Sequence, residues 1–312
     1  METKKRIIPI VFCFDDNLEL AAGVCLSSLL IHAAPNTFYD VFILHSDSCK
    51  FPAGRLNELP GLYGNCRITY RTVGREFEEA FEIRGITVAA YYRLLIPELI
   101  PEYDKVLYSD VDVIFRDDLS GIYISTNLDE YYVGGVSTPY SDITEYVERV
   151  IKTSITQYIA SGNLILNSKK MRKDDLVDKF KEVAQFKWKY QDMDIINIVC
   201  AGKIKILPPW FCMTGTTFEI LKDVGQSYYP EEIAAYARSC GIIHYNGPKP
   251  WNQYCLNFDI WWEYYRKSIF FDEKFYYDFY VKKMNEYDSL SLWKRVKILL
   301  RYFKTGGIIK QR

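Results

Sequence analysis

The first half of the chain alternates strand-like and helix-like hydrophobic patterns. Residues 7–14 form a continuous apolar run, as in a strand that is buried on both faces. Apolar residues then recur at helical spacing over residues 18–30, and Asp16 is a suitable N-cap for that helix. Residues 41–44 and 68–73 predict two more strands, and residues 88–95 predict a helix closed off by Pro97. Such alternation is typical of parallel βαβ units in a layered α/β domain.

Residues 105–115 carry the most informative pattern. If this run is an extended strand, Asp110 and Asp112 point to one face while Val111 and Val113 point to the other. The two carboxylates would then emerge together at the carboxyl end of a strand, where open α/β sheets bind ligands. Further along, residues 132–136 and 163–166 predict strands, and residues 169–186 predict a charged surface helix.

The C-terminal segment has a different character. From residue 289 to residue 312 it contains basic residues and no acidic ones, and apolar residues recur near helical spacing. That pattern favours a basic amphipathic helix on an anionic membrane surface over an ordinary helix docked on the body of the protein. The basic residues are Lys294, Arg295, Lys297, Arg301, Lys304, Lys310 and Arg312, and the apolar ones are Trp293, Val296, Leu299, Leu300 and Phe303.

Composition narrows the classes of function. With 312 residues, of which 49% are hydrophobic, the chain can bury a full core, and its formal net charge of -1 provides no overall basic field for nucleic acid. No apolar run is long enough for a spanning helix, and the N-terminal run does not read as a signal peptide. The eight cysteines form no Cys-x-x-Cys pair, which favours buried thiols in a reducing cytoplasm over a disulfide framework or a zinc site.

An acidic pair alone is weak evidence for a metal site, because such pairs also occur in solvated turns. A hard divalent cation on a nucleotide diphosphate needs one or two carboxylates and a further ligand or water. His244 is the candidate for that ligand, since it ends an apolar run and opens a loop made rigid by Gly247, Pro248 and Pro250 that presents Lys249.

With these residues in view, the chain resembles the bacterial glycosyltransferase family 8. These are retaining enzymes of the GT-A fold, which include lipopolysaccharide α-galactosyl- and α-glucosyltransferases and, more distantly, glycogenin. The resemblance spans about residues 6 to 260. Five motifs occur in the family's order: Phe14-Asp-Asp-Asn17, Tyr91-Tyr-Arg93, Tyr108-Ser-Asp110-Val-Asp112, Gln191-Asp-Met-Asp194, and His244 to Trp251.

The resemblance implies a role for each motif. Asp110, Asp112 and His244 would hold Mn²⁺ or Mg²⁺, and Asp192, Arg93 and Lys249 would act on the reacting groups. Asp15 would accept a hydrogen bond from uracil, and Asn17 would help to hold the nucleoside. The UDP-sugar would be bound by Asp15, Asn17, Tyr91, Arg93, Ser109, Asp110, Val111, Asp112, Gly247 and Lys249.

Two positions depart from the family pattern. Ala160 stands where an asparagine is expected near the donor sugar, and Met193 stands where a glutamine was proposed as a nucleophile in some members. The donor sugar is therefore open between galactose and glucose. Without a nucleophile at Met193, front-face attack by the acceptor is the favoured route to retention.

The resemblance implies a mixed, mostly parallel sheet flanked by helices, with a catalytic domain over residues 1–265 and a helical C-terminal extension over 266–312. The expected activity is metal-assisted transfer of a hexose from a UDP-sugar to a lipid-linked or oligosaccharide acceptor in lipopolysaccharide or other cell-surface glycan synthesis. The expected location is the cytoplasm, at the inner face of the membrane. Two alternatives stay open: an inactive nucleotide-sugar-binding protein, and a nucleotidyltransferase or phosphohydrolase that uses the same carboxylates.

Overall fold

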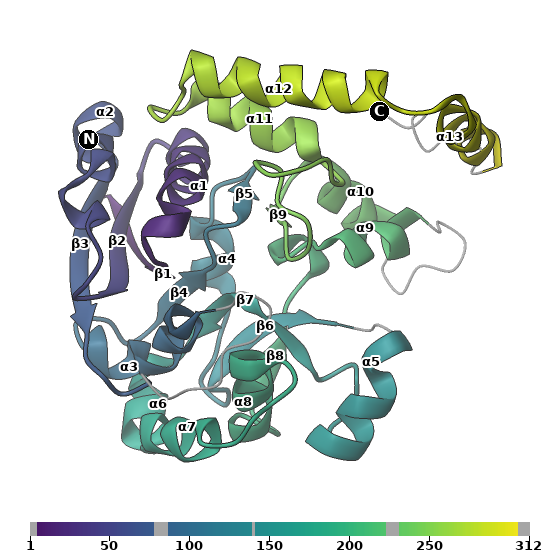
Figure 1. Ribbon diagram of the computed structural model, residues 1–312. Coiled ribbons are helices and arrows are strands. Elements are labelled where there is room, and N and C mark those ends of the chain that lie inside the picture. The colour runs from purple at the N-terminus through teal and green to yellow at the C-terminus, as the bar shows by residue number, and fades with distance from the viewer. Residues whose placement is uncertain (1–4, 78–86, 139–140, 223–230, 305–312) are drawn as a thin grey trace. The chain divides into compact units, whose positions relative to one another are not determined.

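The structure is a computed structural model that describes residues 5–77, 87–138, 141–222 and 231–304. It divides into two compact units, Met1–Phe270 and Phe271–Arg312. The first unit contains all the strands and the helices α1 to α11, and the second contains α12 and α13 (Figure 1). The assignment of catalysis to residues 1–265 stays a prediction.

A seven-stranded sheet organises the first unit in the order β3-β2-β1-β4-β7-β6-β8. Neighbours from β3 to β4 are parallel, β7 is antiparallel to both β4 and β6, and β8 is parallel to β6. The sheet is thus mixed and mostly parallel, as predicted. Its strands are β1 (Arg6–Cys13), β2 (Thr37–Ser46), β3 (Cys66–Val73), β4 (Val106–Ser109), β6 (Val133–Ser137), β7 (Ile159–Leu166) and β8 (Ile204–Ile206).

Helices cover both faces of this sheet because the central strands alternate buried side chains between two cores. On one face Ile10 and Phe12 pack against α1 and α2, and on the other Val11 and Cys13 pack among η4, α3, α6, α7 and α8. These helices are α1 (Glu19–Ile31), α2 (Leu59–Tyr63), η4 (Val88–Leu95, a 3-10 helix), α3 (Ile96–Leu99), α6 (Ser168–Lys173), α7 (Leu176–Ala184) and α8 (Gln191–Val199). The other α-helices described in the first unit are α4 (Ser120–Ser125), α5 (Ser141–Tyr146), α9 (Gly215–Lys222), α10 (Glu231–Ser239) and α11 (Phe258–Lys267).

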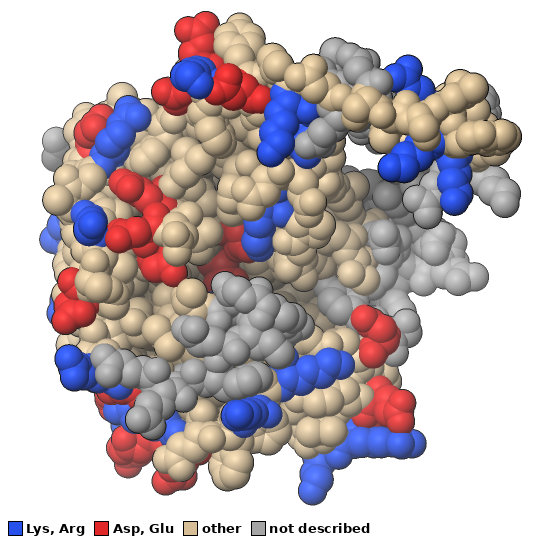
Figure 2. Space-filling view, viewed as in Figure 1, with Lys and Arg blue, Asp and Glu red and all other residues tan. Residues whose placement is uncertain are grey.

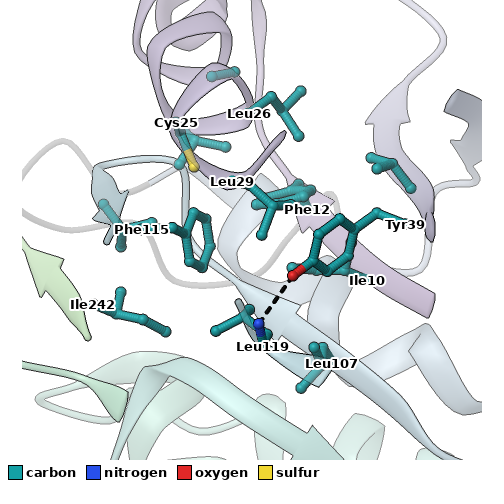
Figure 3. Close-up of a cluster of buried hydrophobic side chains, with 14 of the residues drawn as sticks. Ile10, Phe12, Cys25, Leu26, Leu29, Tyr39, Leu107, Phe115, Leu119 and Ile242 are labelled. Atoms are coloured by element: carbon teal, nitrogen blue, oxygen red, sulfur yellow. Dashed lines mark hydrogen bonds between the residues drawn. The ribbon is translucent and has the colours of Figure 1, made fainter. Parts of the chain in front are cut away.

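A second, two-stranded sheet joins the middle of the chain to its later part. In it β5 (Val113–Phe115) runs antiparallel to β9 (Ile242–His244). Both strands are anchored in the α1 core, since Phe115 and Ile242 lie in the same buried cluster as Leu26 and Leu29 (Figure 3). Burial of these apolar groups fixes the position of β9 in space, and therefore the position of the loop that follows it.

Four local predictions are wrong in detail. Residues 105–115 are not one strand, because β4 ends at Ser109 and β5 begins at Val113 in a different sheet. Pro97 does not close the preceding helix; it lies in the first turn of α3, where its missing N–H leaves no bond unmade. The helix expected over 169–186 is broken at Asp175, whose φ of 51° is left-handed. Asp16 does not cap α1, whose N-cap position is Leu18 and has no side-chain cap. Asp15 caps the short 3-10 helix η1 (Asp16–Leu18) that precedes α1, by accepting from the Asn17 N–H, and Asp16 accepts from the N–H groups of residues 50 and 51.

The cysteines and the helices of the structure bear on two predictions, that of free thiols and that of no spanning helix. All eight cysteines are free, and five of them are buried. Among the helices that the structure describes, none combines the length and the apolar character needed to cross a membrane.

The C-terminal unit consists of α12 (Glu273–Asp288) and α13 (Leu292–Lys304). The predicted amphipathic segment is therefore helical from Leu292 to Lys304, and several of its apolar side chains are exposed: Trp293 is 81% exposed and Leu292 is 75% exposed. Lys310 and Arg312, which belong to the predicted basic segment, lie outside the described residues.

Candidate active site

Asp110, Asp112 and His244 converge, although 132 positions separate His244 from Asp112. His244 Nε2 lies 3.2 Å from Asp112 Oδ1 and 3.5 Å from Asp110 Oδ2, and one ligand atom from each of the three residues falls within 4.8 Å of the others. Two carboxylates and one imidazole form a donor set suited to a divalent cation such as Mn²⁺ or Mg²⁺.

The β5–β9 pairing explains this convergence. Val113 is paired with His244, so the end of β9 lies beside the connection between β4 and β5, which carries Asp110 and Asp112. This place, where the three side chains meet, is called the corner below. The Tyr245 N–H also donates to the Asp112 carbonyl at 2.9 Å. On the other side, the Asp110 N–H donates to the Gly162 carbonyl at 2.8 Å, which ties the first aspartate to β7. The backbone therefore sets the positions of all three side chains.

Lys249 is the second positively charged partner of Asp112, beside His244. Its Nζ lies 2.5 Å from Asp112 Oδ2 and donates to the Tyr245 carbonyl at 2.7 Å. Burial works against the charge of Asp112, but His244 and Lys249 outweigh it and hold the pKa of that carboxyl well below its usual range. Burial likewise opposes a charge on His244, and Asp112 raises the pKa of its imidazole well above the ordinary value. Asp112 is therefore a carboxylate at neutral pH.

Arg93 lies beneath this corner and is only 7% exposed. Its Nη2 lies 2.9 Å from Asp110 Oδ1 and its Nη1 lies 3.3 Å from Asp192 Oδ2, while Nη1 also donates to the Ser161 carbonyl at 2.8 Å. Burial disfavours the guanidinium charge, yet Asp110 and Asp192 raise the pKa of Arg93. Burial raises the pKa of Asp192, and Arg93 opposes that rise. Arg93 thus connects the two aspartates and fixes their positions relative to each other.

Tyr108 adds a further contact from β4. Its hydroxyl donates to Asp110 Oδ1 at 2.5 Å, and its ring lies under the Arg93 guanidinium with the centroid 4.4 Å from Cζ. Both oxygens of the Asp110 carboxylate are therefore engaged, with Oδ1 directed to Tyr108 and Arg93 and Oδ2 toward His244.

Gly162 lies against the corner at very short range. A Cβ at this position would fall 2.3 Å from His244 Cε1 and 2.9 Å from Asp110 Oδ2, so any side chain would displace one of the two groups. The imidazole is therefore seated directly on the backbone of β7.

The predicted nucleoside-binding residues lie at the end of β1. Asp15 is half-buried and accepts from the Asn17 N–H at 3.0 Å and from the Thr87 hydroxyl at 3.2 Å, and the side chain of Asn17 is exposed. Tyr91 and Val111 are buried in the two cores, where Tyr91 lies 5.5 Å from the Phe77 ring between centroids.

The remaining predicted residues lie around the same corner. The Ser109 hydroxyl donates to Asn163 Oδ1 at 2.8 Å, and Gly247 is exposed in the loop that carries Lys249. Ala160 is buried in β7, and the half-buried Met193 packs against a small cluster around Tyr158. Asp194 accepts from the hydroxyls of Tyr146 and Tyr158, as expected for a structural role.

Sequence reasoning missed two residues that touch His244: Gly162, and Cys212, whose sulfur lies 3.5 Å from His244 Nδ1. Gly162 belongs to the same family motif as Ala160, but the local sequence does not reveal either contact, because both depend on how β7, β9 and the residues after Phe211 pack together. Across the face in Figure 2, acidic and basic side chains are interspersed, in keeping with the small net charge.

Known proteins resemble the chain in both sequence and structure. The model of Glycosyl transferase family 8 matches residues 9–255. A lipopolysaccharide 1,2-glucosyltransferase of Escherichia coli is 28% identical over 79% of this chain and 73% of its own length. A predicted glycosyltransferase of Haemophilus influenzae is 26% identical over 64% of this chain, which spans only 60% of that protein. The solved galactosyltransferase LgtC, bound to donor and acceptor sugar analogues, superposes with a TM-score of 0.71 at 25% identity, over 86% of this chain and 98% of LgtC.

Proposed function

The chain belongs to glycosyltransferase family 8 and has its GT-A fold, and from that premise we propose that it is a metal-dependent hexosyltransferase. It would transfer galactose or glucose from a UDP-sugar to a saccharide acceptor with retention of configuration, in lipopolysaccharide or other cell-surface glycan synthesis. The name of the Escherichia coli relative supports the pathway.

One observation carries the proposal: Asp110, Asp112 and His244 place their ligand atoms within 4.8 Å of one another. A divalent cation held there would act as a Lewis acid that stabilises the departing diphosphate. A triad of this composition fits such a cation, since carboxylate oxygens suit Mg²⁺ and imidazole is an accepted ligand of transition metals.

On the leaving-group side, Lys249 would supply a positive charge that is already held in place. It is half-buried on the loop after Tyr245 and is paired with Asp112 through its Nζ at 2.5 Å. This ammonium would stabilise the negative charge that builds on a diphosphate bound at the proposed cation. Such preorganised charge needs little rearrangement during the reaction.

On the sugar side, we assign Asp192 to the positively charged anomeric centre or to a sugar hydroxyl. Arg93 holds Asp192 Oδ2 at 3.3 Å and keeps it apart from the metal-site carboxylates. Met193 packs into an apolar cluster and offers no nucleophile. Retention would therefore proceed by front-face attack of the acceptor hydroxyl, with its proton passing to the leaving phosphate oxygen.

The uridine would lie at the end of β1. Asp15 keeps one oxygen on the Asn17 N–H and the other on the Thr87 hydroxyl, and each oxygen retains capacity to accept from the uracil N–H. Asn17 is exposed beside it and would contact the nucleoside.

A panel of UDP-sugars tests the proposal. The protein is incubated with each sugar nucleotide, with Mn²⁺ or with EDTA, and the release of UDP is followed with and without simple saccharide acceptors. We expect release with UDP-galactose or UDP-glucose that requires the metal and increases with acceptor. Binding of a UDP-sugar without release would favour the inactive binder, and no metal-dependent binding of any UDP-sugar would rule out the proposal.

We further propose that the catalytic part of the chain is residues 1–265 and that the extension attaches it to the cytoplasmic face of the membrane. The support is α13, where apolar side chains such as Trp293 and Leu299 are exposed beside Lys294, Arg295 and Lys297. Basic residues next to exposed apolar groups are typical of helices that lie in the surface of anionic membranes.

Removal of residues 289–312 should lower binding to vesicles that contain phosphatidylserine and leave donor hydrolysis unchanged. A sharper variant changes only Lys294, Arg295 and Lys297 to glutamine. Each basic residue near an anionic surface contributes about 1 kcal/mol, so the partition coefficient should fall about a hundredfold. Cosedimentation with the vesicles measures this change.

Pure phosphatidylcholine vesicles provide the control, because they lack the surface charge, and the triple variant should bind them as the unaltered protein does. If the shortened chain and the triple variant bind anionic vesicles as well as the full chain, α13 is not the attachment site.

A further inference from the structure

The two ring nitrogens of His244 face different surroundings. Nε2 points to Asp110 and Asp112, at 3.5 and 3.2 Å, while Nδ1 lies 3.5 Å from the sulfur of Cys212. Both side chains are buried, with His244 8% exposed and Cys212 1% exposed. One nitrogen therefore faces the proposed cation site, and the other faces a thiol inside the protein.

The backbone holds Cys212 in this place. The neighbouring Met213 exchanges hydrogen bonds with β9: its N–H donates to the Ile242 carbonyl at 2.9 Å, and its carbonyl accepts from the His244 N–H at 2.8 Å. The short 3-10 helix η6 (Pro209–Phe211) leads directly into this pairing. Cys212 therefore flanks the end of β9, with its backbone held beside that of His244.

Gly162 limits the ring from another direction. A Cβ there would fall 2.3 Å from His244 Cε1 and 2.7 Å from Nδ1, so the imidazole already touches the backbone of β7. The ring is thus confined by the glycine, by the thiol and by the two aspartates.

We propose that Cys212 is a positioning residue of the metal site, an inference that rests on the proposed function. Its sulfur accepts a hydrogen bond from Nδ1–H of His244, which leaves the Nε2 lone pair directed at the cation. An imidazole ligand binds through one nitrogen while the other is fixed by a partner that sets the tautomer and ring orientation. In this chain a buried thiol takes the place of the more usual carboxylate or carbonyl.

The effect should be measurable but moderate. Loss of such a partner commonly lowers metal affinity 10- to 100-fold, and a thiol sulfur is a weak acceptor, so we expect a decrease of about tenfold. Cys212→Val keeps a compact apolar side chain and removes the acceptor, whereas Cys212→Ser keeps an acceptor. Cys200→Val is the matched control, because Cys200 is also fully buried but lies in the other core, among residues of α7 and α8.

The test measures Mn²⁺ affinity in the presence of UDP by electron paramagnetic resonance. We expect Cys212→Val to bind Mn²⁺ about tenfold more weakly, and Cys212→Ser and Cys200→Val to stay within about threefold of the unaltered protein. Unchanged affinity in Cys212→Val, or equal losses in Cys212→Val and Cys200→Val, would overturn this inference alone. If the unaltered protein does not bind Mn²⁺ with UDP, the proposed function fails and this inference fails with it.

A second measurement does not need any Cys212 variant to fold. The chain has three histidines, so the imidazole ¹⁵N resonances of the Mg²⁺–UDP complex can be assigned with His32→Gln and His45→Gln. We expect Nδ1 of His244 to carry the proton and Nε2 to carry none. A proton on Nε2 in that complex would overturn the inference.

Discussion

Replacing Asp112 with alanine is expected to reduce the turnover number for UDP release by about 10²- to 10³-fold, the effect of removing one preorganised group that stabilises developing charge. Asp112 contacts both His244 Nε2, at 3.2 Å, and Lys249 Nζ, at 2.5 Å. Its removal would delete a proposed metal ligand and leave the imidazole and the ammonium without their shared anion. Steady-state assays with saturating UDP-sugar and Mn²⁺ measure the change.

Asp104→Ala is the matched control for this experiment. Asp104 is an exposed aspartate whose partners are Lys169 and Arg172, at 3.0 and 3.3 Å. Surface pairs of this kind contribute little, so the turnover number should stay unchanged. If Asp112→Ala turns over at the rate of Asp104→Ala, the acidic pair has no part in the reaction.

Replacing Arg93 with methionine is expected to lower the free energy of unfolding by about 3 kcal/mol, at the lower end of the range for breaking a buried charge pair. Arg93 is 7% exposed and is the shared cation of Asp110 and Asp192. Methionine would fill most of the space but leave two carboxylates facing each other across a poorly solvated site. Denaturation with urea at pH 7 measures the difference.

The loss of stability in Arg93→Met should depend on pH. Burial raises the pKa of Asp192 and Arg93 opposes that rise, so the pKa should rise further without Arg93, and the destabilisation should become smaller as the pH falls and Asp192 takes up a proton. Arg149→Met is the control, since the Arg149 side chain is 78% exposed and pairs with Glu145 across one helical turn, at 2.7 Å. We expect it to change the stability by less than about 0.5 kcal/mol. Equal stability of Arg93→Met and Arg149→Met at pH 7 would show that the buried aspartates do not require Arg93.

The strands of the sheet could be predicted from the sequence where their burial produces a regular spacing of apolar residues. The runs of β1, β2 and β3 are almost continuously apolar or alternate regularly, so their positions were found, although the ends of β2 extend further than its pattern. The break at Asp175 was missed because a left-handed residue other than glycine leaves no compositional signal. The helix end predicted at Pro97 was wrong because proline stops a helix only when it falls beyond the first turn, and Pro97 lies in the first turn of α3.

The site residues were predicted from the family motifs, and the hydrophobic pattern did not give their arrangement. Asp110 and Asp112 were expected to meet on one face of a strand, whereas the structure places them in the connection between β4 and β5. They face His244 because β5 pairs with β9, a contact between residues 113 and 244 that no local pattern encodes. The contacts of Gly162 and Cys212 with the imidazole depend on two further long-range contacts, the Asp110 N–H with the Gly162 carbonyl and Met213 with β9, which no local pattern encodes either.

The central claim is that Asp110, Asp112 and His244 hold one cation beside the diphosphate. A crystal structure of the protein with Mn²⁺ and UDP tests it most directly. The account predicts a single ion with Nε2 of His244 and one oxygen from each aspartate at about 2.0–2.6 Å, the range of oxygen ligands around hard divalent cations, and with diphosphate oxygens in the remaining positions. UDP bound at the end of β1 with the His244 imidazole well outside coordination distance of the ion would contradict it.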